Sequence, residues 1–402
     1  MKLVGGTAFG VAAAVALCLA LPAQAAGPKQ LTAVFAKTSY LPGQKAALVV
    51  RGPEKRLELQ VLRAGAERAW SAVGRPWGPP QRIRFRHPGR NRLLVRVGDW
   101  SSGLYFARLT APGGRAVAYA PFVVRAAEPG RNRVAVVLPT YTWQAYNRYD
   151  ADRNGKGDSW YFEHDRRNVV LGRPYAGVGK PPHYRTQQRG FLRFLVHAGH
   201  AADYLTDEDL DAIGSGDDLA RLYDLVIFSG HEEYVTEHMY DVTERYRDLG
   251  GNLMFLSANN FFWRVNLKGN RLWRIQLWRN LGRPEARLVG VQYRGNDRGG
   301  HTAPYVPTEA SGWLLGGVGS ALGSLRYGIE FDMTTPDSPP GTAVLAEVDP
   351  GLAGGAIRGQ MAYYETPAGA KVFAAGTLGF GGSDNPVAAT LFRNLWQRLS
   401  SP

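Results

Sequence analysis

The sequence predicts a β-sandwich domain followed by an α/β domain with a doubly wound, mostly parallel sheet. Three observations support this prediction. Residues 31–126 form short segments in which apolar and polar side chains alternate, as in half-buried strands. From Val134 onward, longer strand-like and helix-like patterns alternate. The segment Glu128-Pro129-Gly130 separates the two patterns and reads as a linker.

Residues 1–26 have the features of a secretory signal peptide. Lys2 precedes an apolar run over residues 4–21, and Ala23-Gln24-Ala25 forms a small-x-small cleavage site. Cleavage would remove Cys18, the only cysteine, which excludes disulfides, zinc–thiolate sites and a cysteine nucleophile from the mature protein. We therefore expect a periplasmic or secreted protein with no integral membrane segment after cleavage.

The predicted sandwich occupies residues 27–127 and is immunoglobulin-like in its strand spacing. Its expected strands are LTAVFA, ALVVRG, RLELQVL, NRLLVRVG, LYFARLTA and AYAPFVVRA. Turns such as Pro42-Gly43 and Pro112-Gly113-Gly114 divide them. Because His, Asp and Glu do not cluster in this region, we expect the functional site elsewhere.

The predicted α/β domain occupies residues 132–402. Its expected strands include VAVVLPT, ADYLTDEDL, LYDLVIFSG, NLMFLSANN and KVFAAGTL, and its expected helices include FLRFLVHAG and HMYDVTERYRDLGG. The strand VAVVLPT is almost continuously apolar, as a strand buried on both faces of a parallel sheet should be. After residue 280 the pattern is less regular until a final helix over residues 385–399.

We interpret the formal net charge of +14 as arising from arginines spread along the whole chain. A basic protein binds polyanions weakly by default. The chain contains no basic run, aromatic–basic repeat or nucleic-acid motif. We therefore predict no nucleic-acid function.

Polar, chemically capable residues follow three of the predicted strands. VAVVLPT leads into TYTWQAYN, DLVIFSG into HEEY, and LMFLS into ANNFFWRV. Ligands of open parallel sheets bind beyond the carboxyl ends of the strands, so these segments are expected to form the site. No G-x-S-x-G, H-E-x-x-H or P-loop motif is present. His231 and Glu233 remain as an acid–base or metal-binding pair.

The strings TYTWQAYN, RPY, GHEEY and GGNLMFLSANNFFWRV resemble the C-terminal domain of the N,N-dimethylformamidase large (β) subunit family. The resemblance implies a fold similar to class I glutamine amidotransferases without the cysteine nucleophile. It also implies a mononuclear Fe(III) held by two tyrosinates and one carboxylate. On matching motifs these ligands are Tyr146, Tyr175 and Glu233, with Tyr184 as the alternative second tyrosine. Phenolate and carboxylate oxygens are hard ligands that suit a trivalent ion.

The resemblance also implies catalytic residues. His231 and Asn259 would position the substrate and water, and Glu365 in the YYE segment would be the general base. The expected substrate is a small-molecule amide. Three features depart from the family pattern: Val235 replaces a tryptophan, an insertion follows QAYN, and a signal peptide is present. Dimethylformamide and a small-subunit partner are therefore not carried over to this chain.

The insertion itself resembles the start of a calcium-binding loop. Asp150, Asp152, Asn154 and Asp158 place oxygen ligands at alternating positions around Gly155. The twelfth position, which normally holds a bidentate glutamate, is Tyr161, although Glu163 lies close by. The pattern predicts a possible Ca²⁺ site beside the expected iron site.

Two functional hypotheses follow. In the first, the protein is an exported metal-dependent hydrolase that cleaves an amide C–N bond. In the alternative, it is a non-catalytic exported binding or surface protein that uses the cleft of a degenerate amidotransferase-like domain. Geometry separates the two, because the first requires the oxygens of Tyr146, Tyr175 and Glu233 to meet at one point.

Overall fold

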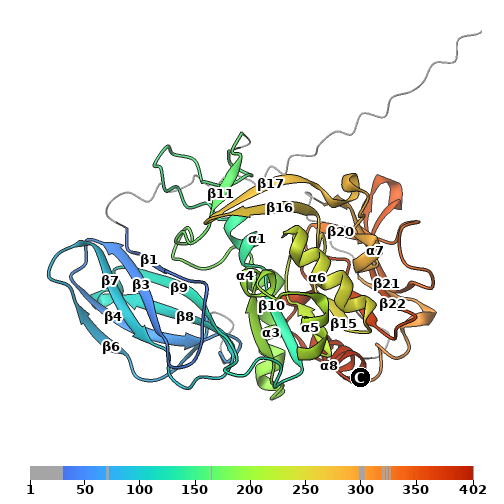
Figure 1. The fold of residues 1–402 in the computed structure, drawn as a ribbon, viewed down its shortest axis with the longest axis horizontal. Coiled ribbons are helices and arrows are strands. Elements are labelled where there is room, and N and C mark those ends of the chain that lie inside the picture. Colours follow the sequence, from blue (N-terminus) through green and yellow to red (C-terminus); the bar gives the residue numbers. More distant parts are fainter. Residues whose placement is uncertain are drawn as a thin grey trace, which may run out of the picture.

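A computed structural model describes residues 30–68, 72–163, 165–297, 304–318, 322, 325 and 327–401 (Figure 1). The expected signal peptide, with Cys18, lies outside these residues. Within the described part of the chain, no helix combines the length and apolar character needed to span a bilayer.

Residues 31–124 form two sheets that share one core, and we call them the N-terminal β domain (Figure 1). One sheet has the order β1-β3-β7, and the other has the order β2-β9-β8-β4-β5 with β6 paired to β4. Phe35 of the first sheet packs on Phe122 of the second, with ring centroids 4.5 Å apart. The strands are β1 (Thr32–Phe35), β2 (Ser39–Tyr40), β3 (Lys45–Gly52), β4 (Arg56–Arg63), β5 (Arg75–Pro76), β6 (Gln81–Arg84), β7 (Gly89–Arg96), β8 (Gly103–Thr110) and β9 (Val117–Val124).

The rest of the chain is built on an eight-stranded sheet with the order β12-β10-β13-β15-β23-β22-β21-β19. The first five strands in this order are parallel, and the remaining three run antiparallel to their neighbours. In sequence order the strands are β10 (Val134–Leu138), β12 (Asp203–Thr206), β13 (Leu225–Phe228), β15 (Asn252–Phe255), β19 (Val306–Pro307), β21 (Ala343–Leu352), β22 (Ile357–Glu365) and β23 (Lys371–Ala374).

Helices cover both faces of this sheet because its central strands are apolar on both sides. In β10, Val134 and Val136 enter one core with α3 and α8, whereas Ala135 and Val137 enter the other with α5 and α6. The helices are α1 (Thr140–Ala145), α2 (Tyr184–Gln187), α3 (Arg189–His197), α4 (Asp207–Asp211), α5 (Gly216–Leu222), α6 (Glu237–Asp248), α7 (Ala286–Val289) and α8 (Pro386–Leu399).

Two smaller sheets lie beyond the large one. They have the orders β11-β17-β16-β14 and β18-β20. Their strands are β11 (Asn168–Val170), β14 (Tyr234–Val235), β16 (Trp263–Lys268), β17 (Arg271–Leu277), β18 (Gln292–Asn296) and β20 (Glu330–Met333). The similarity of the α/β domain to class I glutamine amidotransferases, which the family resemblance implies, stays a prediction.

Candidate active site

The three polar segments expected from the sequence lie at one edge of the large sheet. Strand β10 is parallel to β13, and β13 is parallel to β15, so the segments that follow them are neighbours. Side chains tie them together. Thr142 Oγ1 accepts the backbone N–H of Glu233 at 3.1 Å, and Asn260 Oδ1 accepts the backbone N–H of Glu232 at 3.0 Å. The HEEY backbone is therefore clamped between α1 and the segment after β15.

His231 occupies the centre of this edge and is buried. Its Nδ1–H donates to the carbonyl of Ala258 at 2.9 Å, which leaves Nε2 facing the other groups of the site. Nε2 lies 3.1 Å from Glu233 Oε2, 3.3 Å from Tyr146 Oη and 3.8 Å from Glu330 Oε2. Burial lowers the pKa of His231, but the hydrogen bond to Glu233 and the neighbouring carboxylates outweigh it and raise the pKa to about 9.

Two tyrosines complete the cluster around Glu233. The Tyr161 hydroxyl lies 3.0 Å from Oε1 and 2.9 Å from Oε2 of Glu233, and 2.7 Å from the hydroxyl of Tyr234. The ring of Tyr161 stacks on that of Tyr146, with centroids 4.2 Å apart. Burial and the Glu233 charge raise the pKa of both Tyr146 and Tyr161. Both phenols are therefore neutral at pH 7 unless a cation lies beside them.

The structure corrects the prediction for the second tyrosine. Tyr175 packs edge-on against Trp143 at 6.4 Å, and Tyr184 packs against Phe106 at 5.6 Å. Both belong to the core on the face of the sheet opposite to the one that contains Tyr234. Tyr161 stands beside Glu233 instead. Tyr161 is one of several tyrosines in this part of the sequence, and the motif match selected Tyr175 or Tyr184 instead because the insertion obscures the tyrosine spacing.

Glu330, the first residue of β20, brings a second carboxylate to the site. Its backbone carbonyl accepts the N–H of Leu378 at 3.2 Å, which places β20 beside the segment that follows β23. Asn259 Nδ2 donates to Glu330 Oε2 at 3.2 Å. Burial raises the pKa of Glu330, and the positive charge of His231 opposes this shift. The expected contact of Asn259 with the site is thus made through a carboxylate that sequence reasoning missed.

Asn259 is held in an unusual backbone conformation with φ of +53°. Asparagine adopts this left-handed region more readily than most residues. Both oxygens of Asp332 accept the Asn259 N–H, at 2.8 and 2.9 Å. Burial raises the pKa of Asp332 to about 8, against the opposing effect of this hydrogen bond. Asp332 thereby fixes the direction in which the Asn259 side chain points.

The structure also corrects the prediction for Glu365. This residue ends β22 and pairs across the ladder with Lys371, the first residue of β23. Since β23 is parallel to β15, Glu365 lies at the edge of the sheet where the parallel strands begin. It is exposed, and it binds Arg398 at 2.9 Å and Tyr363 at 2.5 Å. Glu365 is therefore at the opposite edge from His231 and cannot be the base.

The donor set at the site fits a hard cation. Nε2 of His231 lies 3.3 Å from Tyr146 Oη and 3.1 Å from Glu233 Oε2. The same glutamate oxygen lies 2.9 Å from Tyr161 Oη. Phenolate and carboxylate ligands favour ions such as Fe(III) over zinc or copper(I). The raised pKa values of the two phenols mean that a bound cation would supply the charge that keeps them deprotonated.

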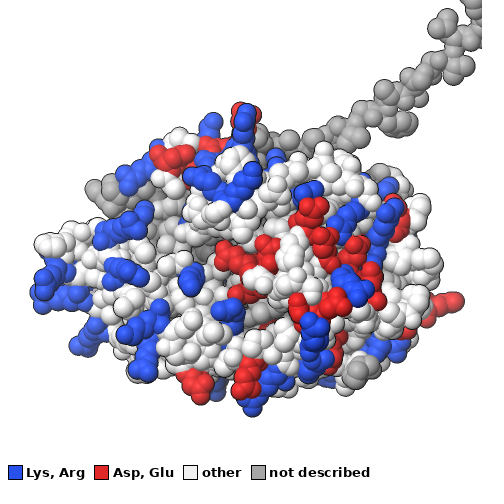
Figure 2. Space-filling view, in the orientation of Figure 1, with Lys and Arg blue, Asp and Glu red and all other residues white. Residues whose placement is uncertain are grey.

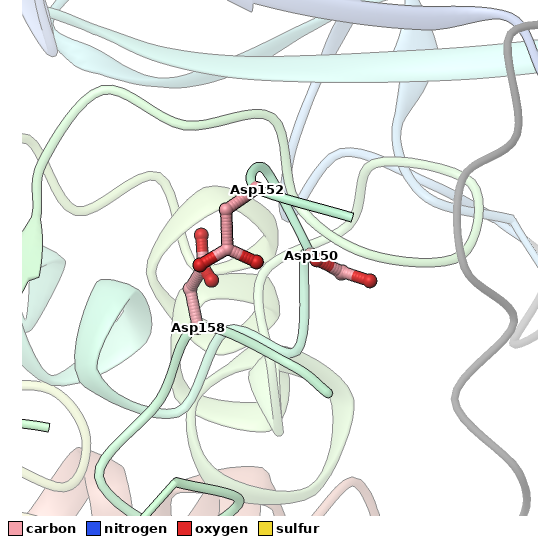
Figure 3. A group of neighbouring side chains, drawn as sticks. All are labelled: Asp150, Asp152 and Asp158. Carbon is pink, nitrogen blue, oxygen red and sulfur yellow. The ribbon is translucent and has the colours of Figure 1, made fainter. Parts of the chain in front are cut away.

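The acidic loop lies between the two stacked tyrosines in the sequence. One carboxylate oxygen from each of Asp150, Asp152 and Asp158 lies within 4.8 Å of the others, and Figure 3 shows the carboxylates of Asp152 and Asp158 next to each other. The backbone N–H of Asn154 donates to Oδ1 of Asp150 and to Oδ1 of Asp152, each at 3.2 Å. Arg166 binds Asp158 at 2.7 Å and Asp152 at 3.2 Å. A calcium ion would have to compete with this guanidinium.

Arg173 holds the same loop in place through hydrogen bonds to its backbone carbonyls. It is 4% exposed, and its guanidinium donates to the backbone carbonyls of Gln144 at 2.6 Å, Asp158 at 2.8 Å and Tyr149 at 3.1 Å. Its Nε donates to the carbonyl of Val170 at 2.8 Å. One side chain thus joins the end of α1, the insertion and β11. The RPY motif supports the site through its arginine, whereas its tyrosine is a core residue.

Comparison with known proteins identifies the family. A sequence model described as "N,N-dimethylformamidase beta subunit-like, C-terminal" matches residues 84–385, a range that begins in β6 and includes the whole site. The N,N-dimethylformamidase beta subunit of Paracoccus aminophilus is 25% identical over 304 residues, which are 58% of this chain and 38% of the relative. That of Alcaligenes sp is 25% identical over 311 residues, 60% of this chain and 39% of the relative.

The chain thus aligns with well under half the length of these curated relatives. Among solved structures, a putative ThuA-like protein from Bacteroides uniformis is 12% identical and aligns with a TM-score of 0.35 over 53% of this chain and 86% of that one, too weak to support an argument. The family predicted from the sequence motifs is confirmed by the match over residues 84–385. The chain belongs to the N,N-dimethylformamidase beta subunit-like, C-terminal family.

Proposed function

We propose that this protein is an exported hydrolase that cleaves the C–N bond of a small amide with the help of Fe(III) bound by Tyr146, Tyr161 and Glu233. The observation that carries the proposal is the meeting of two stacked phenols, a carboxylate and a buried imidazole beyond the carboxyl ends of β10 and β13. The relatives named as N,N-dimethylformamidase subunits support an amide as the substrate class. Export rests on the signal-peptide pattern of residues 1–26.

The residues of the site divide the work of hydrolysis. Bound Fe(III) would polarise the amide carbonyl and acidify water. Glu330 is the base that takes a proton from the attacking water, because its carboxylate faces Nε2 of His231 at 3.8 Å and its burial raises its pKa. His231 donates a hydrogen bond from Nε2 to the developing oxyanion. Asn259 holds Glu330 in place.

Glu330 carries a proton from the attacking water to the leaving nitrogen. The water oxygen bonds to the carbonyl carbon, and the water proton passes to Glu330. Glu330 returns this proton to the leaving nitrogen as the C–N bond breaks. The products are a carboxylic acid and an amine.

The hydrolase hypothesis required the oxygens of Tyr146, Tyr175 and Glu233 to meet at one point. Because Tyr175 lies in the other core, that requirement taken alone would favour the non-catalytic alternative. The Tyr161 hydroxyl, however, lies 2.9–3.0 Å from the oxygens of Glu233, and this second phenol supports the hydrolase proposal.

The test measures metal and colour in the purified full chain. We expect bound iron by elemental analysis and a visible tyrosinate-to-iron charge-transfer band. Tyr161→Phe should weaken and shift the band, because Tyr146 would remain as the other phenolate, whereas the matched Tyr175→Phe, which removes a buried phenol from the other core, should leave it unchanged. Amine release from a panel of small N-substituted amides then measures turnover. A colourless, metal-free protein would overturn the ferric proposal, and a coloured protein without turnover would support the binding alternative.

A further inference from the structure

The positive charge of the chain is not spread evenly, contrary to the reading from the whole sequence. Residues 27–127 contain 18 Lys and Arg but only 4 Asp and Glu, a net charge of +14. Residues 128–402 contain 29 Lys and Arg and 30 Asp and Glu, a net charge of −1. In Figure 2, basic side chains are scattered over the visible surface of the N-terminal β domain, and acidic ones gather on the α/β domain. The N-terminal β domain therefore carries nearly all of the net charge.

One face of the sheet β1-β3-β7 concentrates these cations. Its outward-pointing residues include Arg51 directly opposite Arg90, Lys45 directly opposite Arg96, and Arg92 opposite Val49. All five cations are exposed. Within the described part of the chain, none of them takes part in an ion pair. Like charges placed directly opposite each other destabilise a sheet, and an anion bound between them would remove that cost.

The same face forms one wall of a groove of about 750 Å³ between the N-terminal β domain and the α/β domain. Lys37, Arg51 and Arg90 line this wall. Tyr149, Glu208 and Asp209 of the α/β domain also line this groove. Asp209 is bound by Ser39 at 2.8 Å and by Arg125 at 3.2 Å. The groove thus combines cations without ion-pair partners, an aromatic ring and hydrogen-bond acceptors.

We propose that this groove and the arginine face beside it bind a linear polysaccharide that carries carboxylate groups. Opposed guanidinium groups such as Arg51 and Arg90 match the planar fork of a carboxylate. Glu208, Asp209 and Tyr149 suit sugar hydroxyls and a sugar ring. This site is distinct from the one around His231, and the inference does not depend on the proposed hydrolase activity.

Two other classes of polyanion fit these observations less well. Single-stranded nucleic acids stack successive bases on several aromatic side chains, but the outward residues of β1, β3 and β7 include none, and Tyr149 offers a single ring. A densely charged phosphate chain in the groove would also face Glu208 and Asp209. An anionic bilayer offers a flat surface, whereas Lys37, Arg51 and Arg90 line a groove. A sugar polymer with about one carboxylate per residue is charged as well, but its ring hydroxyls can donate to Glu208 and Asp209, which phosphodiester groups cannot do.

The test measures binding of fluorescently labelled oligogalacturonate to the full chain by anisotropy. The double variant Arg51→Glu/Arg90→Glu should weaken binding at least about tenfold, because it inverts an opposed pair in the groove. The control is Arg56→Glu/Arg84→Glu, which inverts an opposed, exposed pair on the other sheet and changes the net charge equally. The control should weaken binding less than about threefold. Neutral dextran should not compete.

Three outcomes would overturn the proposal. They are equal losses in the two double variants, no binding of oligogalacturonate by the native chain, and tighter binding of single-stranded DNA or anionic vesicles at the same salt concentration. Melting temperatures of both variants establish that they fold. If Arg51→Glu/Arg90→Glu does not fold, Arg51→Gln/Arg90→Gln replaces it with the same expected direction of change.

Discussion

Replacing Arg173 tests whether this residue holds the loop that carries the tyrosines. Its guanidinium donates to backbone carbonyls of α1, the insertion and the end of β11, at distances of 2.6 to 3.1 Å. It is buried, and Asp158 Oδ2 at 3.9 Å is its nearest counter-charge. Burial lowers the pKa of Arg173 to about 10, although Asp158 opposes the shift. Arg173→Met removes all of these donors while roughly preserving the length of the side chain.

The free energy lost by Arg173→Met follows from these contacts. A hydrogen bond from a charged donor contributes about 1.5–3 kcal/mol, and an unsatisfied buried partner costs about 1–3 kcal/mol. The four contacts share one side chain, so their contributions do not add. Release of the buried cation from its desolvation penalty offsets part of the loss. We expect the free energy of unfolding to fall by about 3–5 kcal/mol, the range for breaking a buried charged network.

Urea unfolding followed by circular dichroism measures this change. Arg173→Lys should give an intermediate loss, because a single ammonium cannot reach carbonyls on three separate segments as the planar fork does. The matched control is Arg167→Met, at an exposed arginine a few residues away, which should stay within about 0.5 kcal/mol of the native chain. If Arg173→Met and Arg167→Met destabilise equally, the anchoring role is wrong.

Three further predictions follow from the site. Glu330→Gln should lower kcat about 10²–10⁴-fold in the amine-release assay, because it removes the proposed base. Glu365→Gln, at the opposite edge of the sheet, should leave kcat unchanged. A loss of kcat in Glu365→Gln but not in Glu330→Gln would restore Glu365 as the base. Because folding raises the pKa of Asp332 from 3.8 to about 8, its contribution to stability is full at low pH and is lost as the pH rises toward 8. Asp332→Asn should therefore flatten the melting temperature between these pH values, and an unchanged profile would refute the shift. Millimolar calcium should raise the melting temperature more in Arg166→Gln than in the native chain, since Arg166 competes for Asp152 and Asp158; an equal rise would show that Arg166 does not compete.

The position of the site could be read from the sequence because it depends on local patterns. Continuous apolar runs marked β10, β13 and β15, and the polar residues after each run were visible beside them. Parallel neighbours bring such segments to one edge, so His231 and Glu233 could be placed there together. Asn259 followed from the same argument, although its contact with Glu330 did not.

The residues that were missed depend on long-range pairing. Glu330 lies on β20, in the irregular part of the chain, and reaches the site only because β20 runs beside the segment after β23. Glu365 was assigned from the resemblance of the YYE segment alone, whereas β22 runs antiparallel to β23 and so ends at the opposite edge of the sheet. Neither strand direction can be deduced from alternation of apolar and polar residues. The uneven charge, in contrast, can be counted directly from the sequence of each domain, although the total charge of +14 does not show it.

The insertion after QAYN changes meaning once its contacts are known. In the sequence it was a departure that separated this chain from its family pattern. In the structure it begins beside Tyr146 and ends at Tyr161, the two stacked phenols of the site. Arg166 neutralises its carboxylates, and Arg173 binds its backbone carbonyls. Since a loop held at both ends can set the separation of the residues that flank it, the insertion is best understood as the scaffold that brings the second phenol to Glu233.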